Sequence, residues 1–154
     1  MPRLVKYFEP GLPFLITSRT EEGLPFRTTK DFNSLYYSIL ARAQKLYPVH
    51  ICAFCLMPNH FHMILVPINP EVTPLFVGYV KQELAHAVNR LLGRRKHTIW
   101  CEGYDSPALL GEEEVLEYLC YIYTQPQKAN LVGSIEQYPG ASSWEMFTGG
   151  KQEL

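Results

Sequence analysis

The 154-residue sequence has no long apolar run, no large excess of either charge and only four cysteines. No stretch approaches the roughly 20 apolar residues of a membrane-spanning helix, so we expect no membrane segment. Residues 1–7 lack the apolar core of a secretory signal, which favours a cytoplasmic location. Charged residues make up 19% of the chain and sum to a net charge of −1, while apolar residues make up 47%. This composition indicates a globular chain, which we expect to form one domain over residues 1–154, and excludes a disordered or uniformly basic protein.

The cysteine spacing and the absence of common motifs argue against further classes of protein. Cys52 and Cys55 have the spacing of half a zinc site, but no second such pair or zinc-finger histidine pair follows. They lie in a predicted strand, where residues three apart point to opposite faces, so we expect Cys52 and Cys55 to be small buried apolar residues. The sequence has no P-loop, GxSxG or GxGxxG motif, the common signatures of nucleotide binding and serine hydrolysis.

Apolar periodicity divides the chain into helices and strands. Pro58-Asn59 is a turn signal between two β-rich apolar runs and predicts a hairpin. Gly93 and Pro126 are the expected ends of the second and third helices. The predicted elements are a strand at 14–19, a helix at 30–46, strands at 49–57 and 60–66, a helix at 74–92, a short strand near 98–101 and a helix at 112–124. This order predicts an α+β fold with helices on one side of a sheet.

His60 and His62 are two residues apart in the second strand of the predicted hairpin. Residues i and i+2 of a strand face the same way, so the two imidazoles should project side by side while Phe61 and Met63 point into the other layer. Two neutral imidazoles so placed can share a metal ion. The alternative is a pair of incidental histidines on a solvent-facing surface.

Tyr121 lies on the polar side of the predicted helix at 112–124. At 100° per residue it falls near Glu114 and Gln125, whereas Tyr123 falls on the apolar side with the core. Gln125 follows Tyr121 by one turn on the same face, so its amide oxygen could complete a metal site begun by two histidines. The alternative is an exposed tyrosine without a chemical role.

Charge is distributed unevenly along the chain. Residues 81–97 carry a local charge of +4, and residues 102–117 carry −6 without any Lys or Arg. Basic residues beside an aromatic suit single-stranded nucleic acid, through phosphate pairing and base stacking. The alternative is a solvated helix end whose cations complement the helix dipole. The candidate DNA-binding residues are Lys81, Arg90, Arg94, Arg95, Lys96 and Trp100.

Residues 55–66, CLMPNHFHMILV, resemble the HUH segment of the single-tyrosine transposases, which move insertion sequences as single-stranded DNA, and of their REP-associated relatives. Residues 17–19 resemble the first strand of that family, and residues 121–132, YIYTQPQKANLV, its tyrosine helix. Residues 139–144 resemble its closing element. The resemblance covers about residues 14–147.

The resemblance implies a ferredoxin-like antiparallel sheet with the HUH pair on a central strand. It implies that His60, His62 and Gln125 hold Mg²⁺ or Mn²⁺ and that Tyr121 is the nucleophile. The implied activity is cleavage and rejoining of hairpin-containing single-stranded DNA through a 5′-phosphotyrosine intermediate. It further implies a homodimer, since in insertion-sequence members the tyrosine helix serves the partner's histidine pair.

The sequence departs from the family at several positions. Tyr123 stands where the family often has His, and Gln125 where many members have Asn. Glu102 and Asp105 stand where relatives often have Arg or Lys. Two alternatives therefore remain at this point: a transposase-derived DNA-binding regulator without catalysis, and a small metal-dependent hydrolase that uses the same histidines.

Overall fold

The structure is a computed structural model that describes residues 6–149 apart from 24 and 27 and apart from the side chain of Glu22. The expectation about the N-terminus therefore falls partly outside the described residues. No helix in the described part is both long and apolar enough to cross a membrane. The elements are β1 (Phe14–Arg19), η1 (Glu21–Gly23), α1 (Lys30–Leu46), β2 (Val49–Met57), β3 (His60–Pro67), α2 (Thr73–Leu91), α3 (Glu112–Lys128), η2 (Ile135–Gln137) and α4 (Trp144–Phe147).

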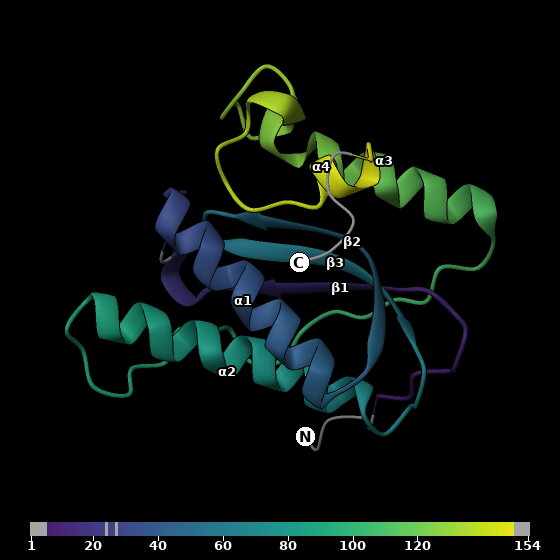
Figure 1. The fold of residues 1–154 in the computed structure, drawn as a ribbon, viewed down its shortest axis with the longest axis horizontal. Helices are drawn as coiled ribbons and strands as arrows, with labels where there is room; N and C mark the ends of the chain where they lie inside the picture. The colour runs from purple at the N-terminus through teal and green to yellow at the C-terminus, as the bar shows by residue number, and fades with distance from the viewer. Residues whose placement is uncertain (1–5, 24, 27, 150–154) are drawn as a thin grey trace.

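The sheet is antiparallel with the order β1-β3-β2, so the predicted hairpin is confirmed and β3 is its central strand (Figure 1). An extended segment, residues 100–108, lines the outer edge of β1 through isolated bridges at Trp100, Asp105 and Ala108. The order of this segment, β1, β3 and β2 is that of a ferredoxin-like α+β sheet, which confirms the predicted fold class. The short strand predicted near 98–101 is only the single bridge at Trp100, because the chain bulges away from β1 directly afterwards.

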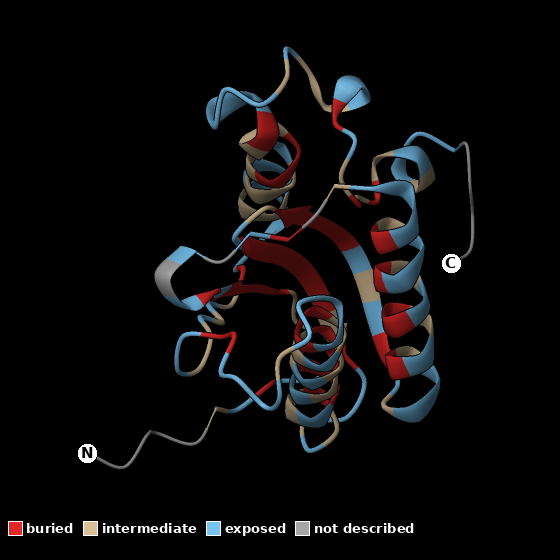
Figure 2. Cartoon of the chain, turned by 90° about the vertical axis from the view of Figure 1, so that its left-hand side faces the viewer, coloured by how far each residue is buried: buried red, intermediate tan, exposed pale blue. Residues whose placement is uncertain are grey.

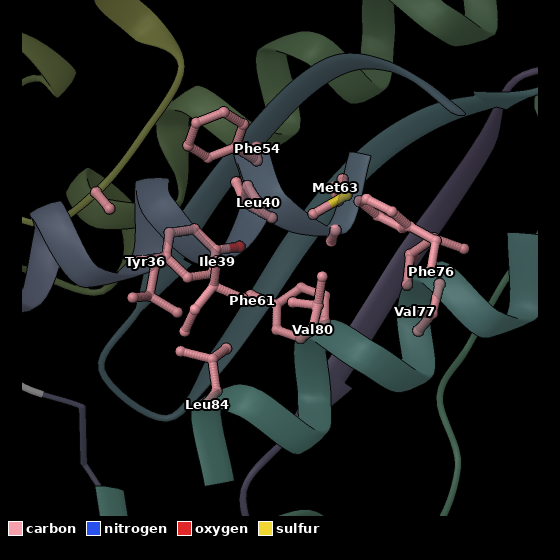
Figure 3. Close-up of a cluster of buried hydrophobic side chains, with 14 of the residues drawn as sticks. Tyr36, Ile39, Leu40, Phe54, Phe61, Met63, Phe76, Val77, Val80 and Leu84 are labelled. Atoms are coloured by element: carbon pink, nitrogen blue, oxygen red, sulfur yellow. The ribbon is translucent and has the colours of Figure 1, made fainter. Parts of the chain in front are cut away.

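Helices α1 and α2 pack together on one face of the sheet (Figures 1 and 3). The helix α1 begins where the Thr29 hydroxyl accepts a hydrogen bond from the backbone N–H of Phe32, at 3.3 Å. Phe61 and Met63 point from β3 into this layer, as their alternation with the histidines predicts. In the close-up, Phe61 and Met63 lie among side chains of both helices and of β2: Tyr36, Ile39 and Leu40 of α1, Phe54 of β2, and Phe76, Val77, Val80 and Leu84 of α2.

The prediction that all helices lie on one side of the sheet is wrong, because α3 covers the opposite face (Figures 1 and 2). Ile64 of β3 packs there against Ile122 and Tyr123 of α3. The Tyr123 hydroxyl is 2.9 Å from the Ser143 hydroxyl, which in turn accepts a hydrogen bond from the backbone N–H of Phe54 at 2.8 Å. The physical reason is that β3 has large apolar residues on both faces, Phe61 and Met63 on one and Ile64 on the other, so each face needs a covering layer.

Pro126 does not end the last long helix as predicted. It is buried inside α3, which continues to Lys128. A proline near the end of a helix removes only one N–H donor, which here would have bonded to the Ile122 carbonyl. The next turn still forms, because the Ala129 N–H donates to the Gln125 carbonyl at 3.0 Å. Gln125 therefore keeps its helical position one turn beyond Tyr121.

We predict that Leu40→Ala lowers the free energy of unfolding by about 2 to 5 kcal/mol, because the leucine side chain is fully buried between α1 and the sheet. Leu116→Ala is the matched control, since this leucine is also helical but 61% exposed, and it should cost less than about 0.5 kcal/mol. Urea unfolding followed by circular dichroism measures both. Equal losses in the two variants would contradict the described core.

Candidate active site

The two predicted histidines lie side by side at the start of β3, on the face that α3 covers. His62 is 1% exposed and His60 is 9% exposed. Their Nε2 atoms are 3.1 Å apart, and the ring planes make an angle of 83°. Two ring nitrogens so close together must share either a proton or a cation, because two facing lone pairs repel each other.

Hydrogen bonds from outside the pair orient both rings. His60 Nδ1 is 2.7 Å from Asn59 Oδ1, an acceptor, so this nitrogen carries a proton and Nε2 keeps its lone pair. His62 Nδ1 is 2.9 Å from the Thr17 hydroxyl. Contacts of this kind fix the orientation of metal-binding imidazoles and leave the opposite nitrogen free for the ion.

The pair is held in the neutral form. Burial lowers the pKa of His60 to about 4, and the charge of Arg19 adds to this effect. Burial lowers the pKa of His62 to about 3, with further contributions from His60 and Arg19. Both imidazoles are therefore uncharged near pH 7, which is the form that binds a metal ion.

Tyr121 comes to this pair from α3. Its ring centroid is 5.2 Å from that of His62, at an interplanar angle of 74°. The Tyr118 ring lies 5.8 Å away on the same helix, and the Lys128 ammonium is 5.4 Å from the Tyr121 ring centroid. A cavity of about 570 Å³ opens beside the contact, lined in part by His62, Tyr118 and Tyr121. The tyrosine singled out on the polar side of its helix is thus half-buried against a histidine rather than solvated.

Gln125 follows Tyr121 by one turn of α3 and is half-buried. No group of three or more His, Cys, Asp and Glu side chains in the described part of the chain is arranged to hold a metal ion. A metal shell that begins with the two imidazoles would therefore be completed by neutral oxygen, such as the Gln125 amide, or by substrate. The two convergent, oriented and neutral nitrogens fit a divalent cation of the transition series.

The candidate DNA-binding residues occupy α2 and the loop after it. Arg90, Arg95 and Lys96 are exposed. Lys81 is directed inward, where its ammonium donates to the Gly103 carbonyl at 2.6 Å. Arg94 is half-buried, with Nη2 3.5 Å from Asn89 Oδ1. Fewer cations are therefore exposed on this surface than the local charge of +4 over residues 81–97 indicates.

Trp100 does not serve as the exposed stacking platform that we expected. Its side chain is 8% exposed and packs against Phe26 and Phe61, while its indole N–H donates to the Lys81 carbonyl at 2.7 Å. The backbone bridge to Thr20 directs the Trp100 side chain into the core. A basic, irregular stretch of sequence gives no sign of such a tertiary contact.

The expectation of buried cysteines holds for Cys55 alone. Burial raises the pKa of its thiol to about 12, so it is an unreactive core residue. Cys52 is exposed because β2 has an irregularity between Ile51 and Ala53, and Cys101 and Cys120 are also exposed.

Three residues lie beside the histidines although the sequence did not place them there: Thr17, Arg19 and Asn59. Asn59 was recognised only as a turn residue, although its place directly before His60 suits a side chain that orients the imidazole. Thr17 and Arg19 come from β1 and reach the histidines only through strand pairing, opposite His62 and His60 respectively. No local pattern reports such a pairing.

Comparisons with known proteins agree with this architecture. Residues 25–125, which contain the histidine pair, Tyr121 and Gln125, match the family described as "Transposase IS200 like". A Haemophilus influenzae protein assigned as a REP-associated tyrosine transposase is 23% identical over 142 residues, which span 80% of this chain and 81% of that protein.

Solved structures show the same fold. A REP-associated tyrosine transposase bound to a REP hairpin matches with a TM-score of 0.77 and 19% identity, over 97% of this chain and 87% of that chain. A Deinococcus radiodurans protein assigned as a transposase matches with a TM-score of 0.52 and 18% identity, over 81% of this chain and 98% of that chain. Since the family match spans about two thirds of the sequence and contains the histidine pair, Tyr121 and Gln125, the chain belongs to the IS200-like transposase family.

Proposed function

We propose that the protein is a single-stranded DNA transposase that cleaves and rejoins DNA through a 5′-phosphotyrosine intermediate. The observation that carries the proposal is the contact between Tyr121 and His62, whose Nε2 converges with that of His60. A nucleophile beside two neutral, oriented nitrogens suits attack on a phosphodiester, which resists nucleophiles because of its negative charge. A bound divalent cation, Mg²⁺ or Mn²⁺, would supply Lewis-acid polarisation of that phosphate.

The side chains of this protein take defined roles in the proposal. His60, His62 and the amide oxygen of Gln125 would hold the cation, and two nitrogen ligands would favour Mn²⁺ over Mg²⁺. The Tyr121 oxygen attacks phosphorus in line; its bond to phosphorus forms as the bond from phosphorus to the 3′ oxygen breaks. The phenolic proton of Tyr121 passes to solvent, and the departing 3′ oxygen takes a proton from solvent. Attack by another 3′ hydroxyl reverses these steps and rejoins the strand without ATP.

The substrate class rests on the family and on the relatives. A transposase acts on DNA, and a protein with the same fold was solved with a REP hairpin bound. We therefore propose hairpin-containing single-stranded DNA as the partner, with its backbone near the exposed Arg90, Arg95 and Lys96.

We predict that Tyr121→Phe abolishes covalent attachment to DNA and leaves DNA affinity within a few-fold, because only the hydroxyl is lost. Tyr118→Phe is the matched control, since this ring lines the same cavity and contacts Tyr121. A labelled hairpin oligonucleotide from DNA flanking the coding sequence is incubated with Mn²⁺, and adducts that survive denaturation are counted.

The same assay separates the proposal from its rivals. An adduct that persists in Tyr121→Phe and disappears in Tyr118→Phe would show that Tyr121 is not the nucleophile. Specific binding without any adduct would favour a regulator. Turnover that survives Tyr121→Phe without an adduct would favour a hydrolase.

We predict that His60→Ala and His62→Ala each remove metal-dependent cleavage and weaken Mn²⁺ binding by at least about tenfold, since each variant loses one of two nitrogen ligands. His50→Ala is the control, because this histidine is exposed at the other end of the hairpin, on β2. Calorimetric titration with Mn²⁺ measures the affinities. Wild-type affinity in both site variants would rule out their role as ligands.

We predict that changing Arg90, Arg95 and Lys96 together to Ala makes the dependence of log affinity on log salt shallower by about two, because each phosphate contact on a single strand contributes about −0.7. The loss should be similar for all sequences. Arg42 and Lys45, exposed on α1, provide a control pair. An unchanged slope in the triple variant would place the main DNA contacts elsewhere.

We propose a homodimer in solution, as the family resemblance implies. Light scattering at micromolar concentration should then report twice the 17.7 kDa of one chain. Tyr121 contacts His62 of its own chain, so the site itself is compatible with either a monomer or a dimer. A mass of one chain would contradict the dimer and leave the proposed chemistry intact.

A further inference from the structure

Four polar side chains form a block on the sheet face beneath α3. Arg19 of β1 is paired with His60 of β3, and Thr17 is paired with His62. Directly paired residues of antiparallel strands share one face and have Cβ atoms about 5 Å apart. On the other side of β3 the corresponding partners are apolar and buried, Met57 beside His60 and Cys55 beside His62. The histidine pair is therefore closed towards β2, and the cavity that reaches His62 lies on the side of β1.

Two cavities meet on that side. The cavity beside Tyr121, of about 570 Å³, and a second one, of about 440 Å³, share four lining residues: Lys6, Thr17, Arg19 and Asp105. The second cavity exists because the pairing of β1 with residues 100–108 is interrupted. The Cys101 N–H donates to the Arg19 carbonyl, and Asp105 pairs with Thr17, while the three residues between them bulge outward around Gly103, whose φ is +76°.

Arg19 is the cation closest in register to the histidines, directly opposite His60, and it lines the cavity that reaches His62. Its charge repels a metal ion held by those imidazoles. Asp105 lines the same two cavities, but among the described residues no carboxylate forms an ion pair with Arg19, so no direct contact neutralises the guanidinium. A guanidinium beside a metal site is favourable only when an anion lies between the two charges.

We propose that Arg19 binds the phosphate that Tyr121 attacks, and that the DNA strand runs along the β1 edge through both cavities. This inference rests on the proposed function. A phosphate placed between Arg19 and His62 is within reach of Tyr121, since these three residues line one cavity. The guanidinium fork matches two phosphate oxygens. The second cavity then accommodates the adjoining nucleotide next to Tyr104, and Arg19 makes metal binding and phosphate binding mutually dependent.

The test uses a ligand with one phosphate, the dinucleotide TpT, and its neutral methylphosphonate analogue. NMR titration of the metal-free full-length protein should show TpT shifting the ring signals of His60 and His62. The wild type should bind the methylphosphonate about tenfold more weakly than TpT. Arg19→Met should lower the affinity for TpT to the same extent and leave the affinity for the methylphosphonate unchanged. Arg42→Met, an exposed arginine on α1, is the matched control. Inorganic phosphate should bind more weakly than TpT, because it leaves the second cavity empty.

A second measurement concerns the metal. Arg19→Met should bind Mn²⁺ more tightly than the wild type without DNA, and TpT should raise Mn²⁺ affinity in the wild type more than in the variant. The proposal fails if TpT leaves the histidine signals unmoved, if Arg42→Met loses as much affinity as Arg19→Met, or if Arg19→Met binds TpT as the wild type does. Equal binding of inorganic phosphate and TpT would contradict the strand path. None of these measurements involves cleavage, so they stand apart from the test of Tyr121.

Discussion

The central strand β3 is buried on both faces and nevertheless carries two imidazoles, and the rest of the site depends on this constraint. A buried polar group is tolerated when it is hydrogen-bonded. Asn59 and Thr17 provide the partners for the outer ring nitrogens, and the inner nitrogens face each other. Burial also keeps both rings uncharged. The core therefore produces a pair of neutral ligands at a fixed spacing.

The same constraint positions Tyr121, the proposed nucleophile. Because the second face of β3 needs a cover, α3 packs there through Ile122 and Tyr123, and Tyr123 is linked through Ser143 to β2. This packing sets the rotation of the helix, and the rotation brings Tyr121 against His62. Core residues adjacent to Tyr121 in the sequence thus determine the geometry of the candidate site, so a repacked Tyr123 would displace Tyr121.

The low net charge of the chain does not conflict with the proposed DNA site, because a few cations at particular positions can hold a phosphate backbone. Arg19 lies beside the histidine pair at the edge that remains open, and Arg90, Arg95 and Lys96 are exposed beyond α2. A single guanidinium next to a metal site has more effect on a bound phosphate than several solvated cations farther away, because screening by salt grows with distance.

Local sequence patterns determined most of the elements, the hairpin, the shared face of His60 and His62, and the helical spacing of Tyr121 and Gln125. Each of these follows from the period of a strand or a helix, which neighbouring residues set. The side of the sheet that α3 covers, the burial of Trp100, the continuation of α3 through Pro126 and the approach of Thr17 and Arg19 were decided by tertiary structure alone. Strand register and layer packing join residues far apart in the chain, so no local period records them.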